Sequence, residues 1–104
     1  MDIPKEDRMV RVYRHRDKKA NHTPPDFDKY WLLENITSKP CAYCGSTKEV
    51  GSDRIDNTQG HTKANIVPCC NTCNRIRINY FSSEDFRKVV AFCIENKLGP
   101  YLSD

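Results

Sequence analysis

Two cysteine motifs, CAYC at residues 41–44 and CNTC at residues 70–73, decide the fold of this chain of 104 residues. Each motif separates two thiols by two residues, the spacing at which a turn or a helix start brings both thiolates to one tetrahedral zinc ion. Gly45 follows the first motif directly and fits the tight turn that such a site needs. A zinc ion with four thiolates has no open position, so we expect a structural Zn²⁺. Its predicted ligands are Cys41, Cys44, Cys70 and Cys73.

The composition agrees with a small metal-stabilised domain. The chain is long enough for one domain with one core, and its 38% of hydrophobic residues is low enough that a metal would add needed stability. No apolar run approaches the ~18 residues of a membrane span, and the N-terminus lacks a signal-peptide core. We therefore expect a cytoplasmic protein without membrane contact, where thiols bind metals. Cys69 is expected to be packed or solvent-facing, and Cys93 to be a small buried hydrophobe.

The segment between the cysteine motifs is longer than the ~15–20 residues of a simple zinc ribbon, which indicates an inserted element. Residues 50–55 and 65–67 are expected to form two strands, because turn residues lie between them at Asp56-Asn57 and Gly60. The second strand leads into a helix that starts at the second cysteine motif. The sequence therefore predicts a unit of strand, strand and helix, held together by one zinc ion.

In this order and spacing the chain resembles the HNH (His-Me finger, ββα-metal) endonucleases, particularly small phage-type members with zinc-binding cysteine pairs. The resemblance rests on CAYCG at residues 41–45, DRIDN at 53–57, Gly60, NIV at 65–67 and CNTCN at 70–74. It implies an α+β fold, a small zinc-stapled ββα-metal finger with flanking N- and C-terminal helices and a basic N-terminal arm. It also implies a metal-dependent DNA endonuclease or nickase of a bacterial or phage-infected cell.

The resemblance assigns roles to four residues. Asp53 matches the Asp that binds the catalytic metal, and Asn74 matches the final His or Asn of that metal site. Their hard oxygens suit Mg²⁺ or Mn²⁺. Asn65 matches the middle Asn, which steadies the hairpin and orients the base. Arg54 stands where the family has its general-base His, and because arginine stays protonated, Arg54 is expected to clamp phosphate instead.

The general base is therefore open. Asp56 lies two residues from Arg54 and shares its strand face if the strand extends that far, although a salt bridge or a turn cap with Asn57 explains it equally well. His61 has a suitable intrinsic pKa, although an exposed loop histidine is the simpler interpretation. Attack without a protein base is the third route. The alternative function is a nucleic-acid-binding zinc module that keeps the fold but has lost catalysis.

The charge pattern indicates DNA as partner only weakly, because the net charge is +3. Residues 8–19 hold six Lys and Arg and one Asp, which fits either a solvated surface or a phosphate-facing arm. Alternating apolar residues at 9–14 favour a short strand or an ordered arm within residues 1–22. The predicted DNA contacts are Arg14, Arg16, Lys18, Lys19, Arg75 and Arg77.

Two helices are expected to flank the zinc-bound core of residues 41–79 in a single domain of residues 1–104. The first lies within residues 23–39, from about residue 24 after Thr23 and two prolines to about residue 35. The second covers residues 82–98, from a capping serine to Gly99-Pro100.

A single nuclease active site cuts one DNA strand per encounter, so a double-strand break requires two copies of the chain. The sequence leaves monomer and homodimer open.

Overall fold

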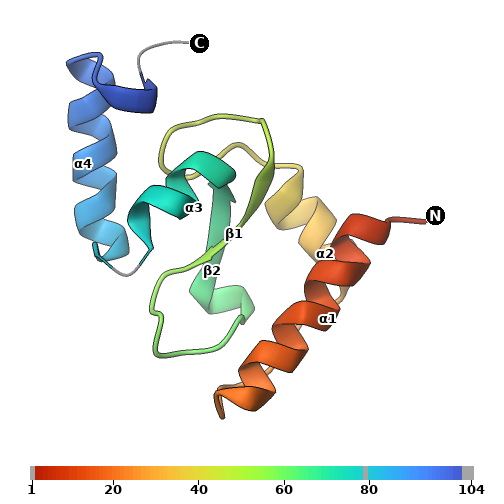
Figure 1. The fold of residues 1–104 in the computed structure, drawn as a ribbon. Helices are drawn as coiled ribbons and strands as arrows, with labels where there is room; N and C mark the ends of the chain where they lie inside the picture. The colour runs from red at the N-terminus through yellow and green to blue at the C-terminus, as the bar shows by residue number, and fades with distance from the viewer. Residues whose placement is uncertain (1, 79, 102–104) are drawn as a thin grey trace.

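The computed structural model describes residues 2–78 and 80–101. Residues 1, 79 and 102–104, which include the expected last residue of the core segment, lie outside the described part. The elements in chain order are α1 (Pro4–Lys19), α2 (Lys29–Leu32), the π-helical turn η1 (Leu33–Thr37), β1 (Val50–Arg54), the 3₁₀ turn η2 (Lys63–Asn65), β2 (Ile66–Cys70), α3 (Asn71–Arg77), α4 (Ser83–Glu95) and the 3₁₀ turn η3 (Gly99–Tyr101) (Figure 1). This is the expected α+β architecture.

The N-terminal segment is a helix, so the expectation of a basic arm or strand over residues 1–22 is wrong. Pro4 and two acidic residues lie in the first turn and basic residues in the last turn of α1, an arrangement that favours a helix. The buried positions recur at helical spacing, at Glu6, Val10, Tyr13 and Asp17. The alternation over residues 9–14 is too short to outweigh this stripe, which packs α1 against the rest of the molecule.

The second helix begins at Lys29 and not near residue 24. Asp28 is its N-cap, because its carboxylate accepts hydrogen bonds of 3.0 Å from the backbone amides of Tyr30 and Trp31. The two prolines therefore precede the helix instead of opening it. The helix continues into η1 and ends at Thr37, before Pro40, as expected from the restriction that a proline places on the preceding residue.

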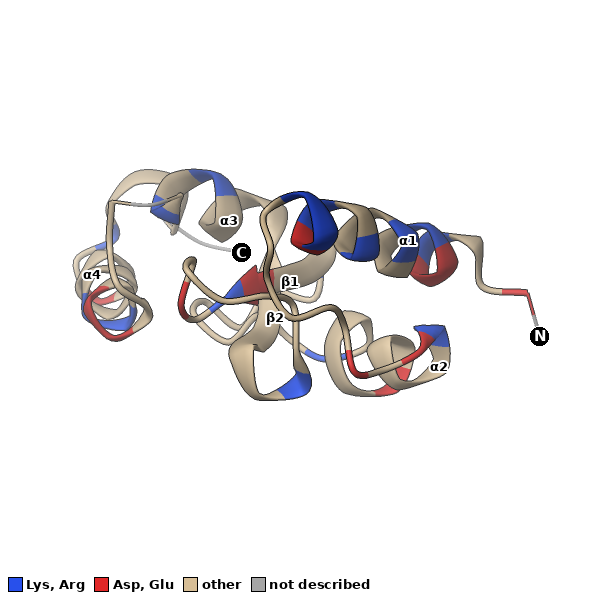
Figure 2. Cartoon of the chain, turned by 90° about the horizontal axis from the view of Figure 1, so that it is seen from below, with Lys and Arg blue, Asp and Glu red and all other residues tan. Residues whose placement is uncertain are grey.

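The hairpin expected between the cysteine motifs is present. β1 and β2 pair antiparallel, with Asp53 opposite Val67 and Arg54 opposite Ile66. β2 is longer than expected and reaches Cys70, whose sulfur caps α3 by accepting from the amide of Cys73 at 3.4 Å. α1 and α3 lie along one side of the hairpin and α2 on the other (Figure 2).

The connection between the two strands passes close to the segment that follows α1. A Cβ added to Gly60 would lie 1.9 Å from the carbonyl oxygen of Thr23, so only glycine fits at this position. Asn65 fixes the same connection from inside, accepting from the amide of Asp56 and donating to the carbonyls of Asp56 and Gly60 at 2.9–3.0 Å. The connection is thus tied both to itself and to the neighbouring segment.

Two hydrophobic clusters, and not one core, hold the fold. The first joins α1, α2, η1 and β2 through Val10, Tyr13, Phe27, Leu32, Ile36 and Ile66. The second packs α4 against the cysteine motifs through Tyr43, Phe86, Val90 and the buried cysteines. The hairpin contributes to both clusters, which explains how a short two-stranded sheet organises the whole chain.

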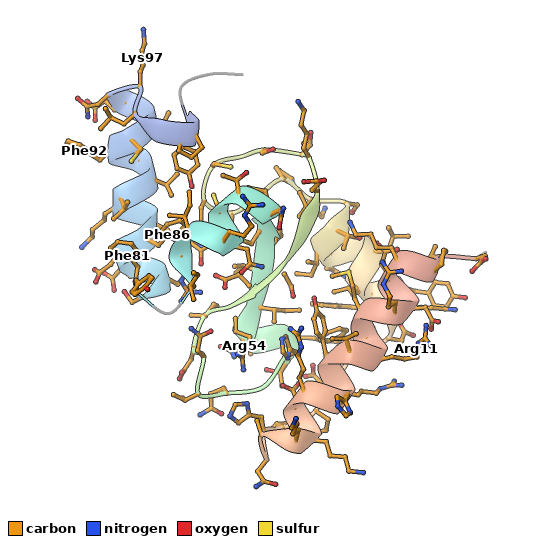
Figure 3. The ribbon with its side chains drawn as sticks, viewed as in Figure 1. Arg11, Arg54, Phe81, Phe86, Phe92 and Lys97 are labelled. Carbon is orange, nitrogen blue, oxygen red and sulfur yellow. The ribbon has the colours of Figure 1, made fainter. Side chains whose placement is uncertain are left out.

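The C-terminal helix α4 begins as expected at its cap, where Ser82 Oγ accepts from the amide of Asp85 at 3.0 Å. It ends at Glu95, three residues before the expected end at residue 98, and η3 follows. Ile94 and Leu98 are each 45% exposed, so they do not extend the buried stripe of Phe86 and Val90. Phe92, 60% exposed, points away from the molecule (Figure 3).

Candidate active site and metal centre

The four predicted zinc ligands come together in one cluster. Their sulfur atoms all lie within 4.8 Å of one another, and Cys44 Sγ is 3.6 Å from Cys70 Sγ. A tetrahedral zinc ion with bonds of about 2.3 Å places its sulfurs about 3.8 Å apart, so the geometry fits a metal ion such as zinc. The amide of Tyr43 donates to Cys41 Sγ at 3.4 Å, and Gly45 adopts a φ of +80° that completes the turn.

Cys69 lies beside this cluster, 1% exposed, which confirms the packed alternative. Its hydrogen bond to Cys41, together with that of Cys73, lowers the pKa of the Cys41 thiol, whereas burial raises the pKa of Cys44 and the bond to Cys41 raises that of Cys73. Cys93, expected to be a small buried hydrophobe, is only partly buried on α4. The four-cysteine set is thus distinct from both remaining cysteines.

Asp53 lies at the inner side of β1, 8% exposed, in a network of polar side chains. Its Oδ2 accepts a hydrogen bond of 2.8 Å from the Tyr43 hydroxyl and a second from Arg77 Nη1. Tyr43 Oη also lies 2.8 Å from Ser83 Oγ, and burial raises the pKa of Tyr43 to about 12. Tyr43 is therefore a neutral hydrogen-bond donor to Asp53 at physiological pH.

Arg77 is an interior residue, which corrects the expectation that it contacts DNA. Only 2% exposed, it donates from Nη1 to Asp53 Oδ2 and to the carbonyl of Arg54, from Nη2 to the carbonyl of Ile55, and from Nε to the carbonyl of Phe81. A guanidinium with its donors satisfied in this way neutralises Asp53 and ties α3 to the end of β1.

Two oxygens at the junction of β1 and α3 remain available. Within the described residues, Asp53 Oδ1 and Asn74 Oδ1 accept no hydrogen bond, whereas Asp53 Oδ2 is held as above and Asn74 Nδ2 donates to the Ser52 carbonyl at 3.2 Å. In the described part of the chain, no side-chain nitrogen or oxygen is both shielded from solvent and without a hydrogen-bond partner. Because Asp53 Oδ1 has no such partner, it is accessible to solvent. A carboxylate and an amide oxygen, both free and both oriented, suit a divalent ion such as Mg²⁺.

Arg54 lies at the end of β1, beside the connection between the strands (Figure 3). Its Nη1 donates to the carbonyl of Gln59 at 3.0 Å and lies 3.5 Å from His22 Nδ1. The guanidinium is thus held beside the connection between β1 and β2. His22 was not among the residues that the sequence singled out, because its proximity depends on the path of the chain after α1.

Asp56 lies beyond the end of β1, so strand alternation does not place it on the face of Arg54. Its Oδ1 accepts from the hydroxyl of Thr58 at 2.6 Å and from the amide of Thr58 at 2.9 Å, as a turn cap does. The Thr58 hydroxyl, and then its amide, lower the pKa of the Asp56 carboxyl, which weakens it as a base. The capping residue pair is thus Asp56 with Thr58, and not with Asn57.

His61 is buried at 7% exposure, so the interpretation as an exposed loop residue is wrong. Its Nδ1 lies 2.9 Å from Asp17 Oδ1, its amide donates to Asp17 Oδ2 at 3.0 Å, and its ring stacks on Tyr13 with centroids 4.1 Å apart. One feature of the sequence points to this arrangement: Asp17 continues the helical spacing of Val10 and Tyr13 on the inner face of α1.

The predicted basic contacts, apart from Arg77, are exposed. Four of them belong to α1 and one to α3, and these two helices lie on the same side of the hairpin (Figure 2). They are Arg14, Arg16, Lys18, Lys19 and Arg75. We call these five residues the basic face. In the described part of the chain, no helix is long and apolar enough to cross a membrane.

Comparisons with known proteins identify a similar fold. No protein-family model matches the sequence, and no curated protein matches it. Among solved structures, the chain is similar to the rare-cutting HNH restriction endonuclease PacI, from a study of how that enzyme perturbs DNA. The two share 20% sequence identity with a TM-score of 0.67, over 92% of this chain and 89% of that one. The chain therefore has the fold of an HNH endonuclease, which confirms the fold expected from the cysteine motifs and the hairpin.

Proposed function

We propose that this chain is a metal-dependent DNA endonuclease, a nickase when it acts as a monomer, that hydrolyses phosphodiester bonds at the junction of β1 and α3. The observation that carries the proposal is the pair of unbonded oxygens, Asp53 Oδ1 and Asn74 Oδ1, on side chains whose other polar atoms are held. The pair lies in a fold shared with an HNH endonuclease. We infer that it acts in the reducing cytoplasm of a bacterial or phage-infected cell, where thiolates remain available for Zn²⁺.

The chain's own residues prepare this site before any ion binds. A Mg²⁺ or Mn²⁺ ion would polarise the scissile phosphate and stabilise the leaving oxygen. Tyr43 and Arg77 fix the orientation of Asp53 through Oδ2, and the Ser52 carbonyl fixes the amide of Asn74. Two hard ligands with fixed orientations lose little conformational freedom on binding, which favours a site for a small, geometrically demanding ion.

The basic face would contact phosphates on either side of the scissile one. The two helices that carry it, α1 and α3, lie on one side of the hairpin and both contact Ser52: Tyr13 Oη is 2.5 Å from Ser52 Oγ, and Asn74 donates to the Ser52 carbonyl. Arg54, whose Nη1 donates to the carbonyl of Gln59, would clamp a phosphate and stabilise charge in the transition state.

A second function, a DNA-binding module without catalysis, is favoured by two observations. Arg54 replaces the expected general-base histidine, and Arg77 already neutralises Asp53, which lowers the attraction of that carboxylate for a cation. Both functions predict DNA binding, so only a cleavage assay separates them.

The test is nicking of supercoiled plasmid DNA by the zinc-loaded protein in Mg²⁺ or Mn²⁺. We expect cleavage by the wild type, none after chelation of the divalent ion, and a loss of at least about 100-fold for Asn74→Ala. The matched control is Asn71→Ala, an exposed asparagine at the start of the same helix, which should cut as the wild type does. Wild-type protein that binds the plasmid without nicking it supports the binding module instead, and protein that does neither excludes both functions.

A further inference from the structure

Asp17 and His61 form a buried pair that the proposed metal site does not use. Asp17, 1% exposed on α1, accepts from the backbone amide of His61 through Oδ2 and meets the imidazole Nδ1 through Oδ1. The ring lies parallel to Tyr13, with an interplanar angle of 4°. Two hydrogen bonds and a stacked ring leave the imidazole in a single orientation.

The pairing determines which nitrogen of His61 can accept a proton. A carboxylate oxygen accepts hydrogen bonds, so Nδ1 carries the hydrogen and Nε2 carries the lone pair. Within the described residues, Nε2 has no hydrogen-bond partner. No side-chain nitrogen there is both unpartnered and shielded from solvent, so Nε2 is accessible to solvent. An imidazole held at Nδ1 by a buried carboxylate, with Nε2 free, is the arrangement that general bases use.

The pair lies on the side of β1 that carries the side chains of Ser52 and Arg54, and the Arg54 guanidinium is near enough to affect the imidazole. Tyr13, on which His61 stacks, contacts Ser52 Oγ at 2.5 Å, and the Ser52 carbonyl accepts from Asn74. One aromatic ring therefore separates the imidazole from the residue that precedes Asp53. Asp56, in contrast, is occupied as a turn cap.

We propose that His61 is the general base of the nuclease proposed above and that Asp17 is its positioning residue. Nε2 of His61 takes a proton from a water molecule, the water oxygen forms a bond to phosphorus, and the bond from phosphorus to the leaving sugar oxygen breaks. The leaving oxygen takes a proton from solvent. The base thus comes from the connection between the strands, oriented by α1, and not from the strand position that Arg54 occupies.

The charges around His61 are consistent with this role. Burial lowers the pKa of the imidazole, the Asp17 carboxylate opposes that effect, and the nearby guanidinium groups of Arg54 and Arg16 lower the pKa further. Tyr13 faces the ring as a neutral phenol, since burial raises its pKa. The imidazole is therefore unprotonated at neutral pH and ready to accept a proton.

A purely structural pair would connect α1 to the hairpin without affecting chemistry, and the experiment must separate the two roles. Plasmid nicking is measured from pH 5 to pH 8.5 for the wild type, His61→Gln, His61→Ala and Asp17→Asn. Zinc content and circular dichroism report folding, and His15→Gln is the control because His15 is exposed on α1. Free imidazole is added to His61→Ala to replace the missing base.

We expect the wild-type rate to fall with one-proton dependence in a pH range below the ordinary histidine pKa of about 6.5, because the pKa of His61 is lowered and a protonated base is inactive. His61→Gln should lose about 100-fold or more, imidazole should restore part of the His61→Ala rate, and Asp17→Asn should lose rate and shift the pH profile. His15→Gln should match the wild type. Folded His61 variants that cut at the wild-type rate overturn the inference and leave the nuclease intact. If those variants do not fold, a wild-type rate without the acid limb overturns it, and a wild type that never cuts overturns both proposals.

Discussion

Arg77 and Asp53 form an ion pair in the interior of the protein, joining the last residue of α3 to β1. Removing one member of such a pair leaves the other charge buried and unpaired, which typically costs about 3–5 kcal/mol. We therefore expect Arg77→Ala to lower the free energy of unfolding by about that amount, measured by urea unfolding of the zinc-loaded protein.

Arg75→Ala is the matched control for this prediction, since Arg75 is an exposed arginine of the same helix. It should change stability by no more than about 0.5 kcal/mol while weakening DNA binding. Equal unfolding midpoints for the two variants would show that the Arg77 pair does not stabilise the fold. The pair also makes Asp53→Ala a poor test of catalysis, because that change leaves Arg77 without both the opposite charge and its hydrogen-bond acceptor; Asp53→Asn also removes the charge but keeps an oxygen that can accept from Arg77.

The cysteine cluster predicts one zinc ion per chain. Cys70→Ser should lose the metal and unfold the domain, because binding of zinc to four thiolates contributes on the order of 10 kcal/mol to folding in small zinc domains. Cys93→Ser should keep the metal and cost less than about 1 kcal/mol, since Cys93 is only partly buried. Elemental analysis and thermal unfolding check both outcomes. A folded wild type without zinc would contradict the prediction.

The sequence predicts those structural features that a local sequence pattern determines. The thiol spacing and the turn residues between the strands suffice to predict the cluster and the hairpin, because both depend on neighbours along the chain. The sequence does not predict contacts between residues that lie far apart along the chain. Arg77 is interior because it pairs with Asp53, which lies 24 positions away in the sequence. His61 is buried because it pairs with Asp17, which lies 44 positions away. Both pairings are set by the packing of helices on the hairpin.

The sequence pattern does not identify the helix over residues 4–19, for a different reason. A strand and a helix both satisfy the short run from Met9 to Arg14, and only the wider spacing from Glu6 to Asp17 separates them. The consequence for function is that the basic residues of α1 lie on the surface of a helix and not on a strand or an arm.

The basic face predicts a salt-dependent affinity for DNA. Replacing its four α1 residues, Arg14, Arg16, Lys18 and Lys19, by Gln should weaken binding and reduce the slope of log affinity against log salt by about 0.9 for each phosphate that the variant no longer neutralises. Lys88→Gln, an exposed lysine on α4, is the charge control and should leave the slope unchanged. Fluorescence anisotropy with a short duplex measures both. An unchanged slope for the fourfold variant would assign these residues to plain solvated surface.

We expect the loss of Arg54 to reduce the cleavage rate and to shift its pH dependence. As a phosphate clamp it contributes charge, so Arg54→Ala should reduce nicking by about 10-fold to 1,000-fold. Because the Arg54 guanidinium also lowers the pKa of His61, the acid limb of the pH profile should move to higher pH in this variant. Arg54→Lys, which keeps the charge but loses the planar geometry, should cut at a rate between those of the wild type and Arg54→Ala. An Arg54→Ala variant that cuts at the wild-type rate would show that Arg54 does not clamp the phosphate.

The Asp17–His61 pair predicts a pH dependence of stability that can be measured without any nuclease activity. Burial holds the pKa of folded His61 below its ordinary value of about 6.5, so the unfolded chain takes up a proton first as the pH falls. The stability that the neutral imidazole contributes is therefore fully present above pH 6.5 and is lost as the pH falls through the lower folded pKa. Urea unfolding at intervals between pH 7.5 and pH 5 should show this loss in the wild type and a flatter curve for His61→Gln. His15→Gln should retain the wild-type slope, since that side chain is exposed; a His61→Gln curve parallel to the wild type would mean that the imidazole titrates alike in the folded and unfolded chain.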